Sequence, residues 1–196
     1  MARAGLAARV DIRHGNGLHM PLPDAGFDAA ICLEAGGDIC VRAADKPQLL
    51  AELRRVLRPG GQVGFSDLVF SRLPTAAEDR ALRALLYHSG RDLLTDWTGL
   101  FAAAGFQLGT VRDIQAQTLP TWQHVQTVYR QHADQVHVRY CRRLGPGIAR
   151  RIGRQVDQVA AAIQRCGSYP ALSATAPGTP PASLPPVHHI STNPNQ

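Results

Sequence analysis

A strand–helix–strand pattern in the first third of the chain is the feature that most restricts its fold. Residues 27–33 (FDAAICL) form a near-continuous apolar run, as expected for a strand covered on both faces. Residues 45–58 then carry leucine and valine at helical spacing, and Pro-Gly-Gly at residues 59–61 ends this helix before a second strand over residues 62–70. This order predicts a right-handed βαβ unit with two parallel strands.

Short strands and helices are expected along the rest of the chain. Residues 10–14 alternate apolar and polar side chains, which is typical of a short strand, and end at the Gly-Asn-Gly turn of residues 15–17. The other predicted elements are helices over residues 76–90, 94–104, 124–143 and 148–166 and strands over residues 106–114, 116–122 and 169–175. Strands that alternate with helices predict an α/β fold class.

Length and composition fit one domain with a short tail. The 196 residues are 44% apolar, enough for a sizeable core, and a single domain of ~150 residues is the usual expectation for such a length. Residues 177–196 hold six of the 14 prolines and almost no large apolar residues. We therefore expect a domain over residues 1–176 and a disordered Pro-rich tail over residues 177–196.

Several classes of protein are excluded by the sequence. No segment reaches the ~18 consecutive apolar residues of a membrane span, and the N-terminus lacks a secretory signal. We therefore expect a cytoplasmic protein with no membrane partner. The cysteines show neither C-x-x-C spacing nor a histidine at a metal-ligand interval, which indicates reduced thiols and no metal site. They are Cys32, Cys40, Cys141 and Cys166.

Three stretches together resemble a known family. They are residues 15–36 (GNGLHMPLPDAGFDAAICLEAG), residues 49–70 (LLAELRRVLRPGGQVGFSDLVF) and residues 94–106 (LTDWTGLFAAAGF). Their order and spacing resemble the class I S-adenosylmethionine-dependent methyltransferases, in the branch that acts on ubiquinone, menaquinone and natural products. The resemblance implies a Rossmann-like sheet, S-adenosylmethionine as cofactor and a small organic molecule as methyl acceptor.

The resemblance also assigns residues that bind the cofactor. The turn after the first strand lies near the adenine in this family, and Asn16 stands where the family has an aspartate that accepts a hydrogen bond from the adenine amino group. An asparagine side chain can still accept through its carbonyl oxygen. The end of the next strand borders the reactive end of the cofactor. The implied cofactor-binding residues are Gly15, Asn16, Gly17, Leu18, Cys32, Leu33 and Glu34.

Two carboxylates are candidates for catalysis. Asp67 matches the acidic residue at the end of the family's next strand, and Asp38 stands where the family often has a histidine. Two nearby carboxylates can raise one pKa enough for general-base chemistry, although a solvated loop is the favoured explanation for Asp38. His88, Trp97 and Trp122 either line an acceptor pocket or pack in the core.

One part of the family pattern is absent from the sequence. The Gly-rich D/E-x-G-x-G-x-G loop and the following strand with an acidic residue do not occur. Because the family's sheet order is 3-2-1-4-5-7-6, we expect a sheet without its first two strands, as in an N-terminally truncated methyltransferase. The gap spans about 14 Å at ~4.8 Å per strand, so residues 10–14 must detach, pair with residues 27–33 or pair with another chain.

This gap has two expected consequences. An unfilled edge at residues 27–33 would be an aggregation liability, and this polypeptide alone should bind S-adenosylmethionine weakly or not at all. The chain would then be a methyltransferase that is inactive alone, or a non-enzymatic remnant or partner module of the same fold. A homo-oligomer or a complementing chain could fill the gap.

A third interpretation is nucleic-acid binding. It rests on arginines around the Gly145-Pro146-Gly147 turn in a chain of net charge +6. These arginines lack interleaved aromatic residues apart from Tyr140, so a solvated helix face is the favoured explanation and nucleic acid is not an expected partner. They are Arg139, Arg142, Arg143, Arg150, Arg151 and Arg154.

Overall fold

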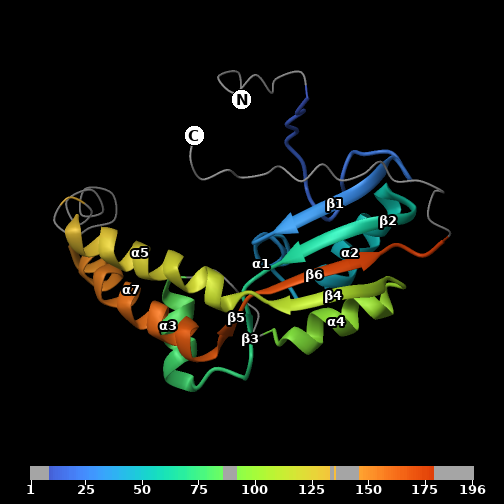
Figure 1. The fold of residues 1–196 in the computed structure, drawn as a ribbon. Coiled ribbons are helices and arrows are strands. Elements are labelled where there is room, and N and C mark those ends of the chain that lie inside the picture. The colour runs from blue at the N-terminus through green and yellow to red at the C-terminus, as the bar shows by residue number, and fades with distance from the viewer. Residues whose placement is uncertain (1–8, 86–91, 133–134, 136–145, 179–196) are drawn as a thin grey trace, which may run out of the picture.

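The fold contains a four-stranded sheet whose strands lie in the order β1-β2-β6-β4 (Figure 1). The structure is a computed structural model that describes residues 9–85, 92–132, 135 and 146–178. Its strands are β1 (Phe27–Leu33), β2 (Leu57–Ser66), β4 (Gln107–Asp113) and β6 (Pro170–Thr175). β1 and β2 are parallel, and β6 is antiparallel to both of its neighbours. This is the 4-5-7-6 part of the predicted order, so the Rossmann-like α/β fold class is confirmed.

Helices connect and flank these strands. Two helices, α1 (Gly36–Ile39) and α2 (Asp45–Val56), lie between β1 and β2 in the chain, which confirms the predicted strand–helix–strand unit with parallel strands. The other helices are α3 (Ala76–Leu85), α4 (Leu94–Ala103), α5 (Gln115–Gln131) and α7 (Pro146–Cys166). Two short strands, β3 (Val69–Phe70) and β5 (Gly167–Ser168), pair with each other outside the main sheet.

The main core lies between the sheet and the helices α2 and α4. Phe65 of β2 contacts Trp97 and Phe101 of α4, with ring centroids 4.6 and 5.5 Å apart. Leu50 of α2 is fully buried in the same cluster. α4 ends at Ala103 and is followed by Gly105, whose φ of +83° is a backbone conformation that glycine adopts without the cost a side chain brings. The predicted stop at residues 104–106 is therefore confirmed.

A second core joins α3, α5 and α7. Ile163 and Val159 of α7 are fully buried and pack with Leu82 of α3, while Trp122 of α5 packs against the edge of this cluster. Tyr169, at the start of β6, also belongs to this cluster. The helical region therefore attaches to the sheet where β6 begins (Figure 1).

The outer side of β1 differs from the prediction. Its apolar composition predicted a strand covered on both faces. Cys32 is buried and Ala30 packs partly buried against the core, but Ile31 is 75% and Leu33 59% exposed. Successive side chains of a strand point to opposite faces, and α2 and α4 cover one face only. Among the described strands β1 also lies at the edge of the sheet, which agrees with the expected exposed edge.

Two predicted strands do not form. Residues 10–14 have no strand structure, and Ile12 is 75% exposed. An isolated strand cannot satisfy its backbone without a partner, and no described strand lies beside it. Residues 116–122 belong to α5 instead. Ile114, Thr118 and Trp122 have the spacing of one helical face, and this face packs against the second core and lines the cavity beside it.

Several expectations concern residues outside the described ranges. These include most of the tail from residue 177, Cys141, His88 and the ends of the predicted helices 76–90 and 124–143. The thiols of Cys32, Cys40 and Cys166 are buried and free, as expected. Among the described residues, no helix is long and apolar enough to cross a membrane, and no cluster of metal-binding side chains occurs.

Candidate functional site

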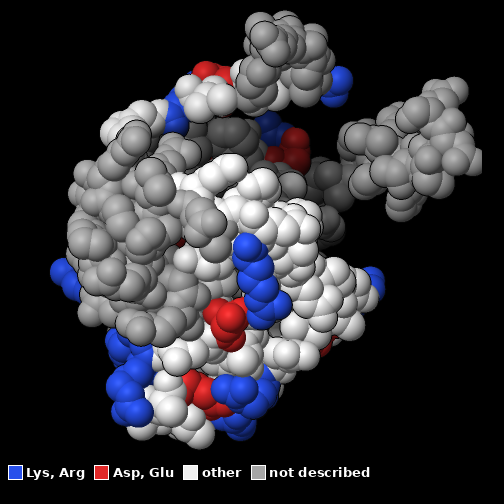
Figure 2. Space-filling model, turned by 90° about the vertical axis from the view of Figure 1, so that its left-hand side faces the viewer, with Lys and Arg blue, Asp and Glu red and all other residues white. Residues whose placement is uncertain are grey.

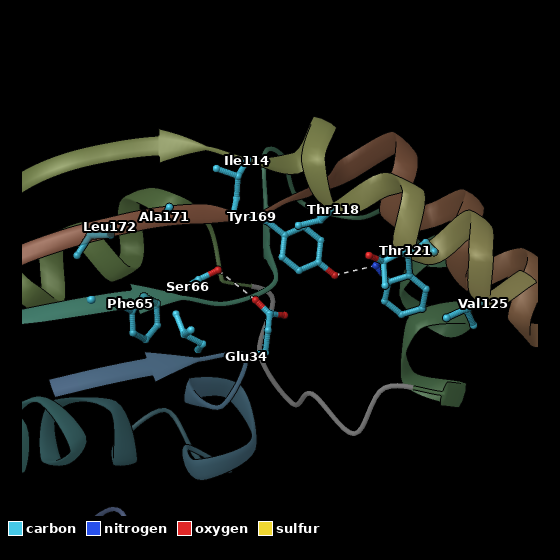
Figure 3. Close-up of a pocket in the computed structure, with 13 residues that line it drawn as sticks. Glu34, Phe65, Ser66, Ile114, Thr118, Thr121, Val125, Tyr169, Ala171 and Leu172 are labelled. Atoms are coloured by element: carbon cyan, nitrogen blue, oxygen red, sulfur yellow. Dashed lines mark hydrogen bonds between the residues drawn. The ribbon is translucent and has the colours of Figure 1, made fainter. Parts of the chain in front are cut away.

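A cavity of about 570 Å³ opens where β1 and β2 end (Figure 3). In open α/β sheets, ligands bind outside the carboxyl ends of the parallel strands. The sheet forms one wall of the cavity, and α5 forms the opposite wall. Its described lining residues come from β1 and β2, from α5 and from the start of β6: Leu33, Glu34, Gly64, Phe65, Ser66, Ile114, Thr118, Thr121, Trp122, Val125, Tyr169, Ala171 and Leu172.

Two aromatic residues connect the helical and sheet walls of this cavity. The indole N–H of Trp122 donates a hydrogen bond of 2.9 Å to the hydroxyl of Tyr169 (Figure 3). Burial raises the pKa of Tyr169 to about 12, so its hydroxyl is protonated at neutral pH. A phenol can accept one hydrogen bond and donate another. This pair can therefore orient a polar group of a ligand while its rings supply apolar contact.

Glu34 supplies a carboxylate at the sheet wall. Its backbone N–H donates to the carbonyl oxygen of Ser66 at 2.7 Å, and the hydroxyl of Ser66 donates to Glu34 Oε1 at 3.1 Å. The φ of Glu34 is +50°, in the left-handed region that disfavours residues with a side chain. β1 therefore ends in a strained residue that is fixed to β2 through both its backbone and its side chain.

The turn at residues 15–18 lies beside α1. The side-chain oxygen of Asn16 accepts the backbone N–H of Leu18 at 2.9 Å, and the backbone N–H of His19 donates to the carbonyl oxygen of Asn16. Gly17 packs so closely on Ile39 of α1 that a Cβ would lie 3.1 Å from that side chain. The turn is therefore fixed both by its own hydrogen bonds and by α1.

Asp67 lies beneath the first turn of α1 and is 2% exposed. Its Oδ2 accepts the backbone N–H of Gly37 at 2.6 Å, and its Oδ1 accepts the backbone N–H of Leu68 at 2.8 Å. The residue that precedes α1, Ala35, makes no side-chain capping bond. Asp67 thus satisfies a helix N-terminal donor that would otherwise be open.

The structure brings together some of the predicted site residues. Leu33 and Glu34 line the cavity, whereas Cys32 points into the core behind them. Gly15, Asn16, Gly17 and Leu18 are not among its described lining residues. Gly17 contacts α1 at Ile39, whereas Asp67 contacts it at Gly37. Asp38 is exposed on α1.

The two tryptophans have different positions. Trp122 lines the cavity, while Trp97 is 1% exposed in the core, with the ammonium of Lys46 5.6 Å from its ring centroid. Sequence reasoning missed Tyr169, Ser66, Thr118 and Val125. The spacing of residues 118, 122 and 125 is the signal that could have revealed a common helix face.

The described part of the face seen in Figure 2 shows no uniform basic patch. On the face seen in Figure 2, acidic and basic side chains lie beside one another. Arg130 pairs with Asp157 at 2.7 Å, and Arg165 pairs with Glu78 at 3.0 Å. The six arginines considered for nucleic-acid binding have no described side chains.

Comparison with known proteins agrees with this geometry. The family model described as a methyltransferase domain matches residues 1–65. The methyltransferase GfsG of Streptomyces halstedii is 29% identical over 120 residues, which are 60% of this chain and 42% of GfsG. The 27-O-demethylrifamycin SV methyltransferase of Amycolatopsis mediterranei is 26% identical over 123 residues, 61% of this chain and 44% of that enzyme.

A solved structure shows the same fold. It is a putative sarcosine dimethylglycine methyltransferase from Galdieria sulphuraria, which superimposes with a TM-score of 0.72 at 15% identity, over 91% of this chain and 63% of that one. The chain therefore spans less than half of the two sequence relatives and under two thirds of this structure. The sheet order and this solved structure show a Rossmann-like fold. In sequence the chain is similar to S-adenosylmethionine-dependent methyltransferases, through the family match over residues 1–65 and through the two relatives.

Proposed function

We propose that the chain takes part in S-adenosylmethionine-dependent methyl transfer to a small organic molecule, and that it binds the methyl acceptor. The cavity at the carboxyl ends of β1 and β2 is the observation that carries this proposal. It lies where α/β folds bind ligands, and its volume falls in the range of about 300–1,000 Å³ typical of small-molecule sites. The names of the two sequence relatives, both methyltransferases, support the reaction type.

Residues 15–18 and 33–34 fit the two ends of a bound cofactor in part. The side-chain oxygen of Asn16 has two lone pairs, of which Leu18 N–H uses one, so it can still accept from an adenine amino group. Leu33 and Glu34 lie at the cavity, where the methyl group would be transferred. When bound, S-adenosylmethionine supplies a methyl group on a positively charged sulfur. The sequence lacks the Gly-rich loop that holds the methionine end, so this polypeptide alone should bind the cofactor weakly.

The residues of this chain would act mainly by orientation. Holding donor and acceptor in line can supply roughly 7–11 kcal/mol of the barrier reduction. The hydrogen bonds of Asp67 to Gly37 and Leu68 favour a positioning role for this residue, because they fix α1 between the turn and the cavity. A catalytic role for Asp67 or Asp38 stays a prediction, and Asp38 would have to reach the acceptor from an exposed position.

Two measurements test the proposal. Calorimetric titration with S-adenosylmethionine should give a Kd weaker than micromolar, and at millimolar cofactor tritium should pass from the labelled methyl group to apolar acceptors that carry a hydroxyl or amine. Substituting Thr121 by Trp would fill the cavity from α5 and should abolish transfer without altering cofactor binding. If neither binding nor transfer occurs at millimolar cofactor, the enzymatic proposal is wrong for this polypeptide.

The exposed edge of β1 favours a second candidate function. β1 lies at the edge of the sheet that the structure describes, and its Ile31 and Leu33 are largely exposed. An unpaired edge of this kind can accept a strand from another chain. A non-enzymatic partner module, or a chain completed by another polypeptide, would show this edge protected from hydrogen exchange only in the complex.

A further inference from the structure

We propose that the hydroxyl of Tyr169 donates a hydrogen bond to a carbonyl oxygen of the methyl acceptor, so that the cavity takes largely apolar molecules that carry a ketone, ester or amide group. This inference rests on the proposed function, since it names a positioning residue and an acceptor class for the same cavity. It concerns binding and orientation of the acceptor, and Tyr169 makes or breaks no covalent bond.

Tyr169 is fixed at the point where the helical region meets the sheet. Its backbone carbonyl oxygen accepts the N–H of Ile114 at 2.8 Å, and its backbone N–H donates to Asp113 Oδ1 at 3.3 Å. Both partners lie at the junction of β4 and α5. Tyr169 is 5% exposed and belongs to the second core. Its hydroxyl is therefore carried by a residue that packing and hydrogen bonds hold in one position, as a group that orients a ligand must be.

The hydroxyl of Tyr169 keeps a donor hydrogen for a ligand. A phenol carries one O–H hydrogen and can also accept, whereas an indole N–H can only donate. The bond of 2.9 Å from Trp122 therefore occupies an acceptor position of the hydroxyl (Figure 3). Within the described ranges, no protein acceptor for the O–H hydrogen is observed. Because Tyr169 lines the cavity, a molecule bound there would supply this acceptor.

The surroundings keep this hydrogen in place. Burial raises the pKa of Tyr169 to about 12, and the hydrogen bond from Trp122 opposes only part of that rise. The hydroxyl is therefore protonated at neutral pH and can donate. A buried donor that has lost its hydrogen bond to water without gaining another is unfavourable, and a carbonyl oxygen of a ligand would remove this cost.

The other hydroxyls of the cavity are less suited to this contact. The hydroxyl of Thr118 donates to a backbone carbonyl oxygen of α5 at 3.0 Å, and that of Ser66 donates to a carboxylate at 3.1 Å, so each uses its single hydrogen. Thr121 is exposed, so water competes for its hydroxyl. Among the described lining residues, Tyr169 is therefore the buried hydroxyl that can donate to a ligand.

The remaining walls favour an apolar skeleton. Leu33 and Leu172 line the cavity from the sheet, and Trp122 and Val125 line it from α5. Leu33 is 59% and Val125 42% exposed, so a ligand in the cavity would remove apolar surface from water. In a mostly apolar site a few polar groups fix the orientation of the ligand. A carbonyl held by Tyr169 would therefore decide which part of the acceptor lies near Leu33, at the end of β1.

Two neutral probes of one shape test this inference without cofactor. Methyl 2-naphthyl ketone carries C=O where 2-isopropenylnaphthalene carries C=CH₂, so the pair differs by one hydrogen-bond acceptor. Equilibrium dialysis gives the ratio of their dissociation constants, and infrared spectroscopy gives the carbonyl stretch of the bound ketone. We expect this stretch below its frequency in hexane, because a hydrogen bond weakens the C=O bond. A stretch at the hexane frequency, or no binding of the ketone up to its solubility, would overturn the inference.

Tyr169→Phe assigns the hydrogen bond. It removes only the hydroxyl, so the ketone should bind about three- to tenfold more weakly, the alkene should bind as before, and the stretch should return toward the hexane frequency. Tyr129→Phe makes the same chemical change on α5 outside the described lining and should leave both measurements unchanged. An unchanged ratio and stretch in Tyr169→Phe, or the expected changes in Thr121→Val instead, would overturn the role of Tyr169.

A double variant keeps the test valid if Tyr169→Phe does not fold. Tyr169→Phe leaves the indole N–H of Trp122 without its acceptor, whereas replacing both partners of a hydrogen bond by apolar groups can be nearly neutral. Tyr169→Phe combined with Trp122→Phe should therefore fold and show the same loss of ketone affinity relative to the alkene. A wild-type ratio in this double variant would overturn the inference.

Thr121→Trp locates the probes, and tritium transfer separates the two proposals. Thr121→Trp fills the cavity from α5 and should abolish binding of the ketone, whereas undiminished binding would place the probe elsewhere and overturn the inference. Ketone binding that depends on Tyr169, without tritium transfer to any acceptor, refutes the proposed function alone. Tritium transfer by a chain whose ketone binding does not depend on Tyr169 refutes this inference alone.

Discussion

The anchoring of α1 by Asp67 can be tested through stability. Asp67 is almost fully buried, and its carboxylate accepts two backbone N–H groups at 2.6 and 2.8 Å. A hydrogen bond to a charged group contributes about 1.5–3 kcal/mol. Asp67→Asn places an amide N–H₂ opposite one of the two donors, so we expect it to cost about 1.5–3 kcal/mol by loss of one such bond.

Asp67→Ala removes both bonds and should cost about 3–6 kcal/mol, a large part of the ~5–15 kcal/mol that stabilises a typical domain. Urea denaturation followed by circular dichroism measures both variants. Asp38→Ala is the control, because an exposed position on the same helix should change stability by no more than about 0.5 kcal/mol. If Asp67→Asn is as stable as the wild type, Asp67 does not anchor α1.

The space around Asp67 allows an independent check of the same contact. A Cβ on Gly36 would lie 2.7 Å from Asp67 Oδ2 and 3.0 Å from the ring of Phe65. Gly36→Ala should therefore destabilise by about 1–3 kcal/mol through overpacking. Gly99→Ala is the matched control, because its Cβ would meet nothing within 4 Å in helix α4, and it should stabilise by about 0.4–1 kcal/mol. Equal effects of the two substitutions would refute the packing described for Gly36.

An ion pair, the sheet edge and two buried thiols each lead to a further measurable outcome. Hydrogen bonds from Arg55 hold the pKa of Glu52 at about 2 instead of 4.5, so this stabilisation is complete above pH 4.5 and is lost as the pH falls toward 2. Arg55→Ala should lower stability at pH 7 and flatten the acid titration followed by circular dichroism, and an unchanged titration would contradict this. Ile31→Lys places a charge on the exposed edge strand and should reduce self-association in sedimentation velocity; wild-type behaviour would show that the edge does not self-pair. Burial raises the pKa of Cys32 to about 11 and that of Cys40 to about 12, so iodoacetamide should modify them at pH 8 only after denaturation, and rapid labelling of the folded chain would contradict their burial.

Elements with a strong local signal could be predicted from the sequence. The apolar run of β1 gave its observed bounds, and the leucine stripe located α2. Residues 59–61, predicted as the stop before a strand over residues 62–70, lie instead within β2. The elements over residues 107–113, 146–166 and 170–175 also lie within a few residues of their predictions. In each case residues close together in the sequence show the spacing of apolar side chains that a strand (period 2) or a helix (period 3.6) requires.

Features that depend on distant partners could not be predicted in this way. Residues 10–14 have the alternation of a strand, but pairing requires a neighbour that the described sheet does not provide. Residues 116–122 are too few to distinguish the apolar spacing of a strand from that of a helix. Their packing in the second core, beside α7 and Tyr169, favours the helix. The cavity draws on residues 33–34, 114–125 and 169–172, so Tyr169 could not be assigned to it without the fold.

The position of Asp67 suggests a structural reason for an acidic residue after β2. This reason does not require Asp67 to transfer a proton. α1 has four residues, far below the ~12–15 at which an isolated helix becomes even marginally stable, so its position depends on contacts. One such contact is Gly17 against Ile39, on the side of the turn, and another is Asp67 against Gly37. Glu34 lies only two residues before α1 and shares its attachment to the end of β2. A shift of α1 would therefore move both the turn at residues 15–18, which resembles an adenine site, and the carboxylate of Glu34 at the cavity. The buried Asp67 thus links the two parts of the site.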